Sequence, residues 1–239
     1  PHSPPTAPMG FYDLHDAAKI KLPVNFAARP TVPAGFPKPS LTANGDLFIG
    51  REATEDEARL MIQSYWASIS WTDWNVGRVI AELDRLGLRE KTVIVFWGDH
   101  GYHLGEMGKW SKHGSLFEVG TRVPMIVTAP GAKASGRSVA QPVQTLDLYP
   151  TLCELTGLRP PAGLDGHSLT PLLENAAADW PHPAFSVAGN RRNLGVAVRT
   201  DKYRYAEWDA SRGGAMLFDE TADPHELKNL ADDLQHAAV

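Results

Sequence analysis

Residues 92–113 read TVIVFWGDHGYHLGEMGKWSKH and join a strand-like run to a dense group of polar side chains. Residues 92–97 are apolar, β-branched or aromatic without polar alternation, which is typical of a strand buried on both faces in a parallel sheet. Gly98 ends the run, and Asp99 and His100 follow at once. Because ligands of open α/β sheets bind beyond the carboxyl ends of the strands, we predict a site with this pair at its mouth.

Side chains that bind metals or carry positive charge are denser behind Gly98 than anywhere else in the chain. They are Asp99, His100, His103, Glu106, Lys109, Lys112 and His113. An Asp–His pair after a strand is often a turn or a helix cap, but the preceding strand and the following lysines favour a site. Ca²⁺ or Mg²⁺ would take the carboxylate readily, whereas Zn²⁺ would accept both groups. The lysines fit an anionic substrate, with solvated lysines as the ordinary alternative.

The composition excludes several classes of protein. The chain has 239 residues, 43% of them hydrophobic, enough for a substantial core in one large domain or a domain with a small appendage. A net charge of -5 without basic runs argues against nucleic-acid binding. The single cysteine, Cys153, excludes an intramolecular disulfide framework and a multi-thiolate metal site. We expect no membrane span, because no apolar stretch approaches the required length.

Residues 1–50 hold nine of the 19 prolines and few periodic apolar runs. Proline fixes φ and removes a backbone donor, so we expect an extended arm laid over the surface of the domain that follows. The opening PHSPPTAP has neither a methionine nor a targeting segment. From this we expect an internal fragment or the downstream piece of a processed chain.

The middle of the chain alternates between helical and strand patterns. Thr54 and Glu57 predict a capping box, apolar residues then recur at about 3.6-residue spacing, and Gly87 supplies a stop. A long amphipathic helix is therefore predicted, and it feeds the 92–97 strand as in the units that build parallel sheets. The other predicted elements are a buried strand at 123–129 and a helix at 147–157.

Beyond residue 160, short runs separated by turn residues predict a small antiparallel sheet. Its strands are expected at 184–188, 195–199, 203–208 and 215–219. Asp223, Pro224 and Glu226 predict a final short helix. The chain is thus expected to comprise an arm at 1–50, an α/β part at 51–160, and the small sheet with its terminal helix at 161–239.

The segment GDHGYHLGEMGKWSKHG, residues 118–124 and the later LDLYPTLCELTGL resemble the C-terminal half of a sulfatase of the alkaline-phosphatase superfamily. Among sulfatases, the likeness is greatest to the iduronate-2-sulfatase group. It runs in order from residues 1–4 through QSYWAS in the long helix to the closing RTDKYRY and DPHELKNLA. The resemblance implies an α/β sandwich in which a large, mostly parallel sheet lies between helices. This chain would hold the C-terminal part of it, plus a small antiparallel subdomain.

The resemblance also implies roles for individual residues. In sulfatases a hydrated formylglycine, made from the cysteine or serine of a C/S-x-P-x-R sequence, attacks sulfur while a divalent cation, usually Ca²⁺, holds a sulfate oxygen. Asp99 and His100 correspond to metal ligands. Lys112 corresponds to the catalytic lysine whose charge offsets negative charge on the sulfate. His2 corresponds to the histidine that contacts the sulfate and assists the leaving oxygen.

About half of such a site has no counterpart in this sequence. No C-x-P-x-R occurs, and Cys153, in TLCELTG, is more simply a small buried hydrophobe. The family's other Asp pair and its upstream Lys and His are also missing. We therefore expect a partner, the N-terminal half of the sulfatase, that carries the formylglycine in a second chain or a missing region. The 239 residues by themselves should not turn over substrate.

Further residues are candidates for substrate binding. His103 and His113 are expected to contact substrate or support residues that do, and Trp110 to wall the pocket. A zinc cluster of His100, His103 and Glu106 is the alternative, although in the family this loop shapes the pocket. In the C-terminal part, candidates for contact with a sugar are Arg191, Arg192 and Trp208, against the ordinary alternatives of solvated arginines and a core tryptophan.

Three functions remain open on the sequence. The first is the C-terminal chain of a sulfuric-ester hydrolase that acts on a sulfated sugar. The second is phosphodiester or phosphonate-ester hydrolysis by a member of the same superfamily. The third is a non-catalytic module that binds sulfated glycans, which a retained Asp99, His100 and Lys112 disfavour because a dead site has no need of them. The family implies an exported location: periplasmic, extracellular or lysosomal.

Overall fold

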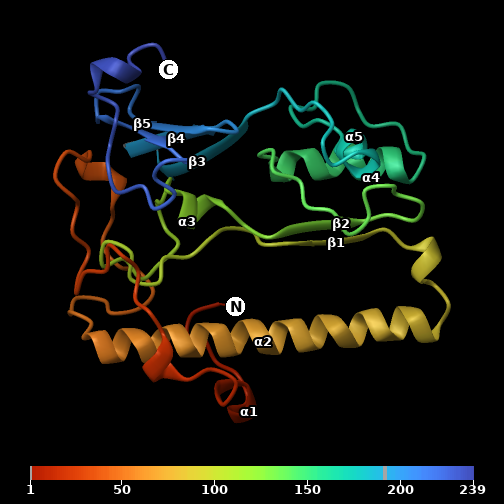
Figure 1. Cartoon of the computed structure of the whole chain (residues 1–239), viewed down its shortest axis with the longest axis horizontal. Helices are drawn as coiled ribbons and strands as arrows, with labels where there is room; N and C mark the ends of the chain where they lie inside the picture. The colour runs from red at the N-terminus through yellow and green to blue at the C-terminus, as the bar shows by residue number, and fades with distance from the viewer. Residues whose placement is uncertain (1, 191–192) are drawn as a thin grey trace.

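The computed structural model describes residues 2–190 and 193–239, arranged as a long helix, a strand pair covered by short helices, and a four-stranded sheet (Figure 1). The long helix, α2 (Glu55–Arg85), runs along one side of the molecule. Its predicted capping box is present: the Thr54 hydroxyl accepts from the Glu57 amide at 3.2 Å, and the Glu57 carboxylate accepts from the Thr54 amide at 2.9 Å. Such a cap is worth about 1 kcal/mol. The predicted helix is confirmed.

The segment before α2 is held mainly by contacts with other parts of the chain. Its regular structure is limited to single turns, α1 (Met9–Tyr12) and 3₁₀ turns at Ala17–Lys19 and Lys38–Ser40. It lies against α2, where the Gln63 amide donates to the carbonyl of His15 at 2.6 Å. Because the segment then crosses to the polar loop after residue 98, it connects the helix with the predicted site.

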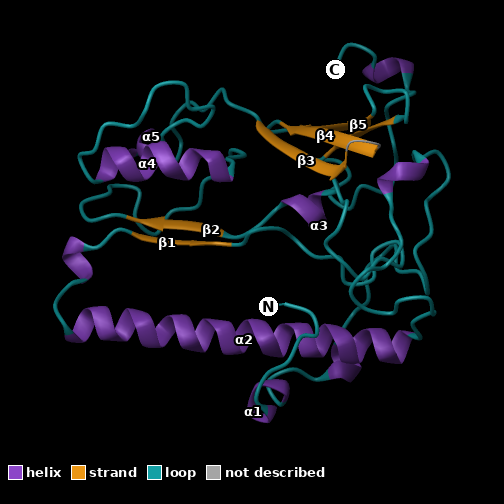
Figure 2. Ribbon diagram, turned by 180° about the vertical axis from the view of Figure 1, so that it is seen from behind, coloured by secondary structure: helices purple, strands orange, loops and turns teal. Residues whose placement is uncertain are grey.

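β1 (Ile94–Trp97) and β2 (Met125–Thr128) form a two-stranded antiparallel sheet (Figure 2). Both strands were predicted, but the parallel pairing expected for the first is wrong among the described residues, where every strand pair is antiparallel. Burial on both faces is also wrong. Val95 packs toward the short helices over the sheet, whereas Phe96 and Trp97 are 36% and 49% exposed. Uniformly apolar sequence does not reveal whether the second face has a cover.

The short helices over this sheet carry its core. They are α4 (Leu148–Leu155), preceded by a 3₁₀ turn at Thr145–Asp147, and α5 (Thr170–Glu174). Asp147 is buried, and its carboxylate accepts from the amides of Gln144 at 2.9 Å and His167 at 2.8 Å. These bonds fix the start of α4 and confirm the predicted helix. Cys153 is buried on α4, as expected of a small hydrophobe.

The C-terminal sheet has the strand order β3-β4-β5-β6, every neighbour antiparallel, and confirms the prediction. Its strands are β3 (Ala184–Asn190), β4 (Asn193–Arg199), β5 (Tyr203–Trp208) and β6 (Ala215–Asp219). Trp208 and Phe218 pack with Leu116 and Phe117, which precede α3 (Glu118–Thr121). Trp208 is 2% exposed, so its suggested contact with sugar is wrong. The paired suggestion for Arg191 and Arg192 falls outside the described residues.

The predicted terminal helix is wrong. Asp223 instead closes a turn, in which its carboxylate accepts from the amides of Leu227 at 2.7 Å and Lys228 at 2.9 Å. Glu226 has a positive φ of 52°, which an α-helix does not allow. The one helical turn beyond β6 among the described residues is a 3₁₀ turn at Leu234–His236. Among residues 2–190 and 193–239, no helix is both long and apolar enough to cross a membrane.

A buried ion cluster connects the C-terminal sheet with α3. The Arg204 guanidinium, 3% exposed, contacts Glu118 and lies 3.0 Å from Glu220 and 3.1 Å from Glu226. Arg199 lies 3.6 Å from Glu118. Arg204 and Arg199 thus face three carboxyl groups, and the exposed Arg122 also lies 3.6 Å from Glu118. Burial raises the pKa of Glu226 to about 8, to which the charge of Glu220 adds, and burial also raises the pKa of Glu220.

The raised pKa of Glu226 predicts that the free energy of unfolding is larger at low pH than at high pH. Because the folded-state pKa of Glu226 lies above its ordinary value of 4.5, its stabilising contribution is complete below that value and is lost as the pH rises through about 8. Glu226→Gln should flatten the decline in the free energy of unfolding between these pH values, measured by urea titration. The exposed control Glu90→Gln should leave the decline unchanged. Equal slopes for Glu226→Gln and the parent would contradict the prediction.

Candidate functional site

Asp99 and His100 lie just beyond the carboxyl end of β1, as predicted, and both are exposed. His100 Nε2 is 3.3 Å from Asp99 Oδ2, and the Asp99 carboxylate also accepts from the His100 amide at 3.1 Å. The loop is fixed from behind, since the Gly101 amide donates to the carbonyl of Gly120 at 3.0 Å. A Cβ at Gly101 would lie 2.1 Å from the Val119 carbonyl oxygen, so only glycine fits there.

Lys112 and His2 meet although 110 positions separate them in the sequence. The Lys112 ammonium donates to His2 Nε2 at 3.1 Å. The segment after His2 is held by Tyr102, whose hydroxyl donates to the Trp110 carbonyl at 3.2 Å and accepts from Ser3 at 2.9 Å. The two residues predicted to be catalytic are therefore brought together.

Two tyrosines, Tyr65 and Tyr102, lie close to Asp99 and to the segment that follows His2. Tyr65 of α2 stacks on Tyr102, with ring centroids 5.4 Å apart. Burial raises the pKa of Tyr102 to about 12 and raises that of Tyr65, to which the Asp99 charge adds. Both hydroxyls therefore keep their protons at neutral pH. Sequence reasoning assigned these tyrosines no role, although both lie in stretches that carry the resemblance, Tyr65 in QSYWAS and Tyr102 in the segment after Gly98.

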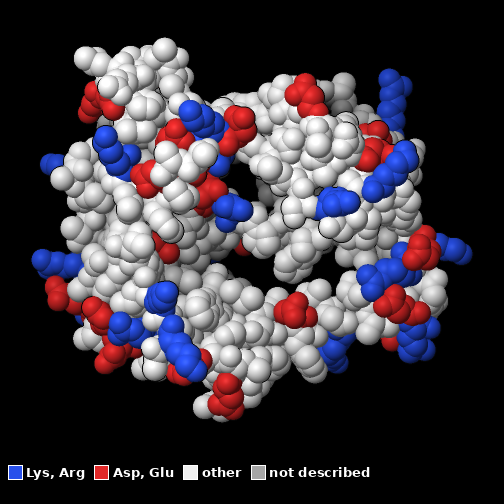
Figure 3. Space-filling view, in the orientation of Figure 1, with Lys and Arg blue, Asp and Glu red and all other residues white. Residues whose placement is uncertain are grey.

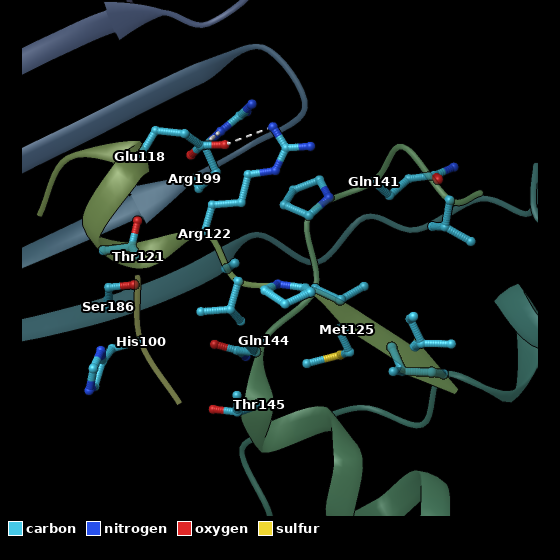
Figure 4. Close-up of a pocket in the computed structure, with 18 of the residues that line it drawn as sticks. His100, Glu118, Thr121, Arg122, Met125, Gln141, Gln144, Thr145, Ser186 and Arg199 are labelled. Carbon is cyan, nitrogen blue, oxygen red and sulfur yellow. Dashed lines mark ion pairs between the residues drawn. The ribbon is translucent and has the colours of Figure 1, made fainter. Parts of the chain in front are cut away.

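A cleft of about 1590 Å³ extends from Asp99, His100 and Lys112 to the C-terminal sheet. At one end it is lined by Asp99, His100, Lys112 and His113, and beyond them by α3, β2, the segment before α4, and β3. Figure 4 labels His100 at one end, with Gln144 and Thr145 facing it from the start of α4 and Ser186 from β3. The space-filling view shows a hollow between the C-terminal sheet and the part of the molecule that holds α4 and α5 (Figure 3).

His103 and Trp110 do not face this cleft. Both side chains are completely buried, so substrate contact by His103 and a pocket wall formed by Trp110 disagree with their positions in this structure. His103 Nε2 shares a 2.6 Å hydrogen bond with Ser115. Burial lowers the pKa of His103 to about 3, so the ring is neutral. The bond joins the Asp99 loop to the loop that carries Lys112, which is a supporting role.

The zinc alternative also fails among the described residues. The Glu106 carboxylate is turned to the amide of Leu104, from which it accepts at 2.6 Å, and His103 is bonded to Ser115. No group of three or more His, Cys, Asp or Glu residues in the described ranges is arranged to hold a metal ion. Lys109 is likewise buried, and its ammonium donates to the Thr42 hydroxyl at 2.8 Å. Burial lowers the pKa of Lys109 to about 8.

The Asp99–His100 pair fits part of a cation site. A carboxylate and an imidazole are both common metal donors. The Asp99 side chain is 85% exposed, and within residues 2–190 and 193–239 its ion-pair partner is His100. Two donors are fewer than the six to eight that Ca²⁺ takes or the four of a typical Zn²⁺ site. By themselves, the described residues would supply only a portion of such a ligand set.

Comparison with known proteins gives the family. Residues 1–158 match the model of the family described as Sulfatase, and residues 105–239 match that of the C-terminal part of N-sulphoglucosamine sulphohydrolase. The chain belongs to the sulfatase family. The expected resemblance is therefore confirmed, including the assignment to the C-terminal portion.

Curated sulfatases are similar over most of the chain but extend well beyond it. Arylsulfatase K of Danio rerio is 36% identical over 74% of this chain and 35% of its own length. Choline-sulfatase of Rhizobium meliloti is 33% identical over 97% of this chain and 44% of its own. Iduronate 2-sulfatase of Mus musculus is 30% identical over 77% and 46%. The chain therefore spans less than half the length of these relatives.

The fold is shared with solved structures of the same superfamily. A phosphonate monoester hydrolase from Silicibacter pomeroyi matches with a TM-score of 0.81 and 29% identity, over 100% of this chain and 51% of that one. The chain therefore has the alkaline-phosphatase-like α/β fold that was expected. Its own described strands supply the antiparallel part of that fold.

Proposed function

We propose that this chain is the C-terminal part of a sulfuric-ester hydrolase that removes sulfate from a sulfated sugar. The observation that carries the proposal is the meeting of Lys112 with His2 beside the cleft that Asp99 and His100 also line. Cations and donors gathered around a tetrahedral anion stabilise the charge that develops on its oxygens. Membership of the sulfatase family makes a sulfate ester the natural substrate.

Each of these residues has a role in the proposal. Lys112 binds a sulfate oxygen with its ammonium. His2, whose Nε2 accepts from Lys112 in this structure, contacts the sulfate and would pass a proton to the leaving oxygen after exchanging that bond for one to the substrate. Asp99 and His100 hold a divalent cation, most simply Ca²⁺, which polarises a sulfate oxygen when bound. The nucleophile, a formylglycine, belongs to the complementary N-terminal half.

This chain exposes an apolar surface to which the N-terminal half could bind. Large apolar side chains are exposed on several sides of α2 and on both faces of β1: Ile69, Trp71, Trp74, Val79, Phe96 and Trp97. An apolar surface of this kind in a folded protein commonly marks an interface. Among the described residues β1 pairs along one edge, so its other edge has hydrogen-bonding groups for a further strand. We propose that the N-terminal half covers these exposed side chains and completes the metal site.

A second reaction is favoured by one observation. The phosphonate monoester hydrolase matches the whole chain with a TM-score of 0.81, so hydrolysis of phosphonate or phosphate diesters is the alternative. The complete protein, meaning this chain with its N-terminal half, should be assayed with 4-nitrophenyl sulfate and matched phosphate and phosphonate esters.

We expect kcat/KM to be highest for the sulfate. A higher value for a phosphonate would transfer the proposal to the alternative. Binding of sulfated glycans without hydrolysis of any ester would favour the non-catalytic module. The family also leads us to propose an exported location, which secretion of a tagged full-length protein would test.

A further inference from the structure

We propose that His113, held in place by Asp46, recognises a hydroxyl or acidic group beside the scissile sulfate and so selects sugar sulfates over simple aryl sulfates. This inference rests on the proposed function and specifies which alcohols the same site prefers. Asp46 lies in the N-terminal arm, and no sequence pattern pointed to it.

The imidazole of His113 is fixed by a largely buried carboxylate. His113 Nε2 is 3.4 Å from Asp46 Oδ1, and the two side chains are 63% and 11% exposed. Asp46 Oδ2 is buried without a hydrogen-bond partner among the described residues. Nε2 is the ring atom that faces this carboxylate, so a proton on Nε2 is the one that Asp46 attracts. The hydrogen bonds among the described residues leave Nδ1 uncommitted.

The backbone around His113 is fixed as well. The Thr42 hydroxyl donates to the His113 carbonyl at 3.1 Å, and the Lys109 ammonium fixes that hydroxyl from behind at 2.8 Å. A Cβ at Gly45 would lie 3.4 Å from the imidazole, so the arm passes close against the ring. Exposed histidines are ordinarily free to change rotamer. Here the contact with Asp46 and the passing arm restrict the ring on one side, which lowers the entropic cost of binding a ligand.

The imidazole of His113 lies where it can contact a substrate bound at Lys112. His113 lines the same cleft as Lys112, Asp99 and His100, so a group that it binds lies near the sulfate. A neutral ring with its proton toward Asp46 accepts a hydrogen bond at Nδ1 from a hydroxyl, and a protonated ring donates there to a carboxylate or second sulfate. Among the described residues the charged group in contact with the ring is Asp46, whose charge also acts on the buried Lys109. A plain aryl alcohol offers nothing for Nδ1 to bind.

The test is a comparison of two esters in the complete protein. kcat and KM are measured for glucose 6-sulfate and 4-nitrophenyl sulfate, with the parent, His113→Ala and Asp46→Asn. We expect His113→Ala to lower the ratio of kcat/KM for the sugar to that for the aryl ester by about tenfold, the effect of one lost hydrogen bond, mainly through KM. Asp46→Asn should lower the same ratio by a smaller factor, because the ring remains but is less firmly oriented.

A matched control is available at the other end of the chain. His236 is also paired with an aspartate, its Nδ1 lying 3.6 Å from Asp233 Oδ2 beyond β6. His236→Ala should leave the ratio unchanged. An equal fall for both esters in His113→Ala, or no fall, would overturn this inference while leaving the proposed function intact. If the parent hydrolysed neither ester, the proposed function would fail and this inference with it.

Discussion

Replacing Lys112 by methionine is expected to lower kcat/KM for a sulfate ester by about 100- to 1000-fold in the complete protein, the usual effect of removing one charged or hydrogen-bonding group from a developing anion. Methionine keeps the length and flexibility of the side chain but has no charge. The ammonium contacts His2 at 3.1 Å, so His2 also loses the donor that orients it. The loss should therefore appear in kcat as well as in KM.

Two further variants separate this effect from a loss of folding. Lys112→Arg keeps the charge but changes its shape, and it should retain more activity than Lys112→Met. Lys133→Met removes an exposed lysine that is paired with Glu174 away from the predicted catalytic pair, and it should match the parent. All variants should unfold at similar temperatures, because Lys112 is only half-buried and its bond to His2 is exposed. Activity of Lys112→Met within threefold of the parent would remove Lys112 from the catalytic site.

The elements predicted correctly were those with a local signal. Thr54 and Glu57 specify the start of α2 through two hydrogen bonds between neighbours, so the sequence contains nearly all of the required information. The strand at 203–208 was likewise predicted from a short run between turn residues, and one face of β5 lies in the core, where Arg204, Ala206 and Trp208 are buried. In contrast, Asp223 and Glu226 resembled a helix start, but the side chain of Glu226 is bound to Arg204, a partner far away in the sequence.

Some residues of the candidate site could likewise be predicted from the local sequence, and others could not. Asp99, His100 and Lys112 were identified through a motif and do line one cleft. His103 belongs to the same motif but faces inward to Ser115, because spacing along an irregular loop does not fix the direction of a side chain. Asp46 and Ser3 lie in a proline-rich arm without periodicity, and their parts in the site arise from contacts across about 70 to 100 residues of sequence.

The second large effect concerns the chain by itself. The isolated 239 residues are expected to hydrolyse sulfate esters no faster than buffer. The described residues offer two metal donors where a cation needs at least four, and the sequence has no C-x-P-x-R from which a formylglycine could form. Lys112 and His2 would then bind an anion without a nucleophile to attack it.

Complementation tests the central claim, that this chain carries one part of a divided sulfatase site. The purified chain is mixed with the corresponding N-terminal half of a sulfatase, formylglycine in place, and release of sulfate from 4-nitrophenyl sulfate is followed. We predict turnover from the mixture, none from either part, and at most about a hundredth of it when the chain carries Lys112→Met. Hydrolysis by the chain alone, or no turnover from a stable one-to-one complex, would contradict the account.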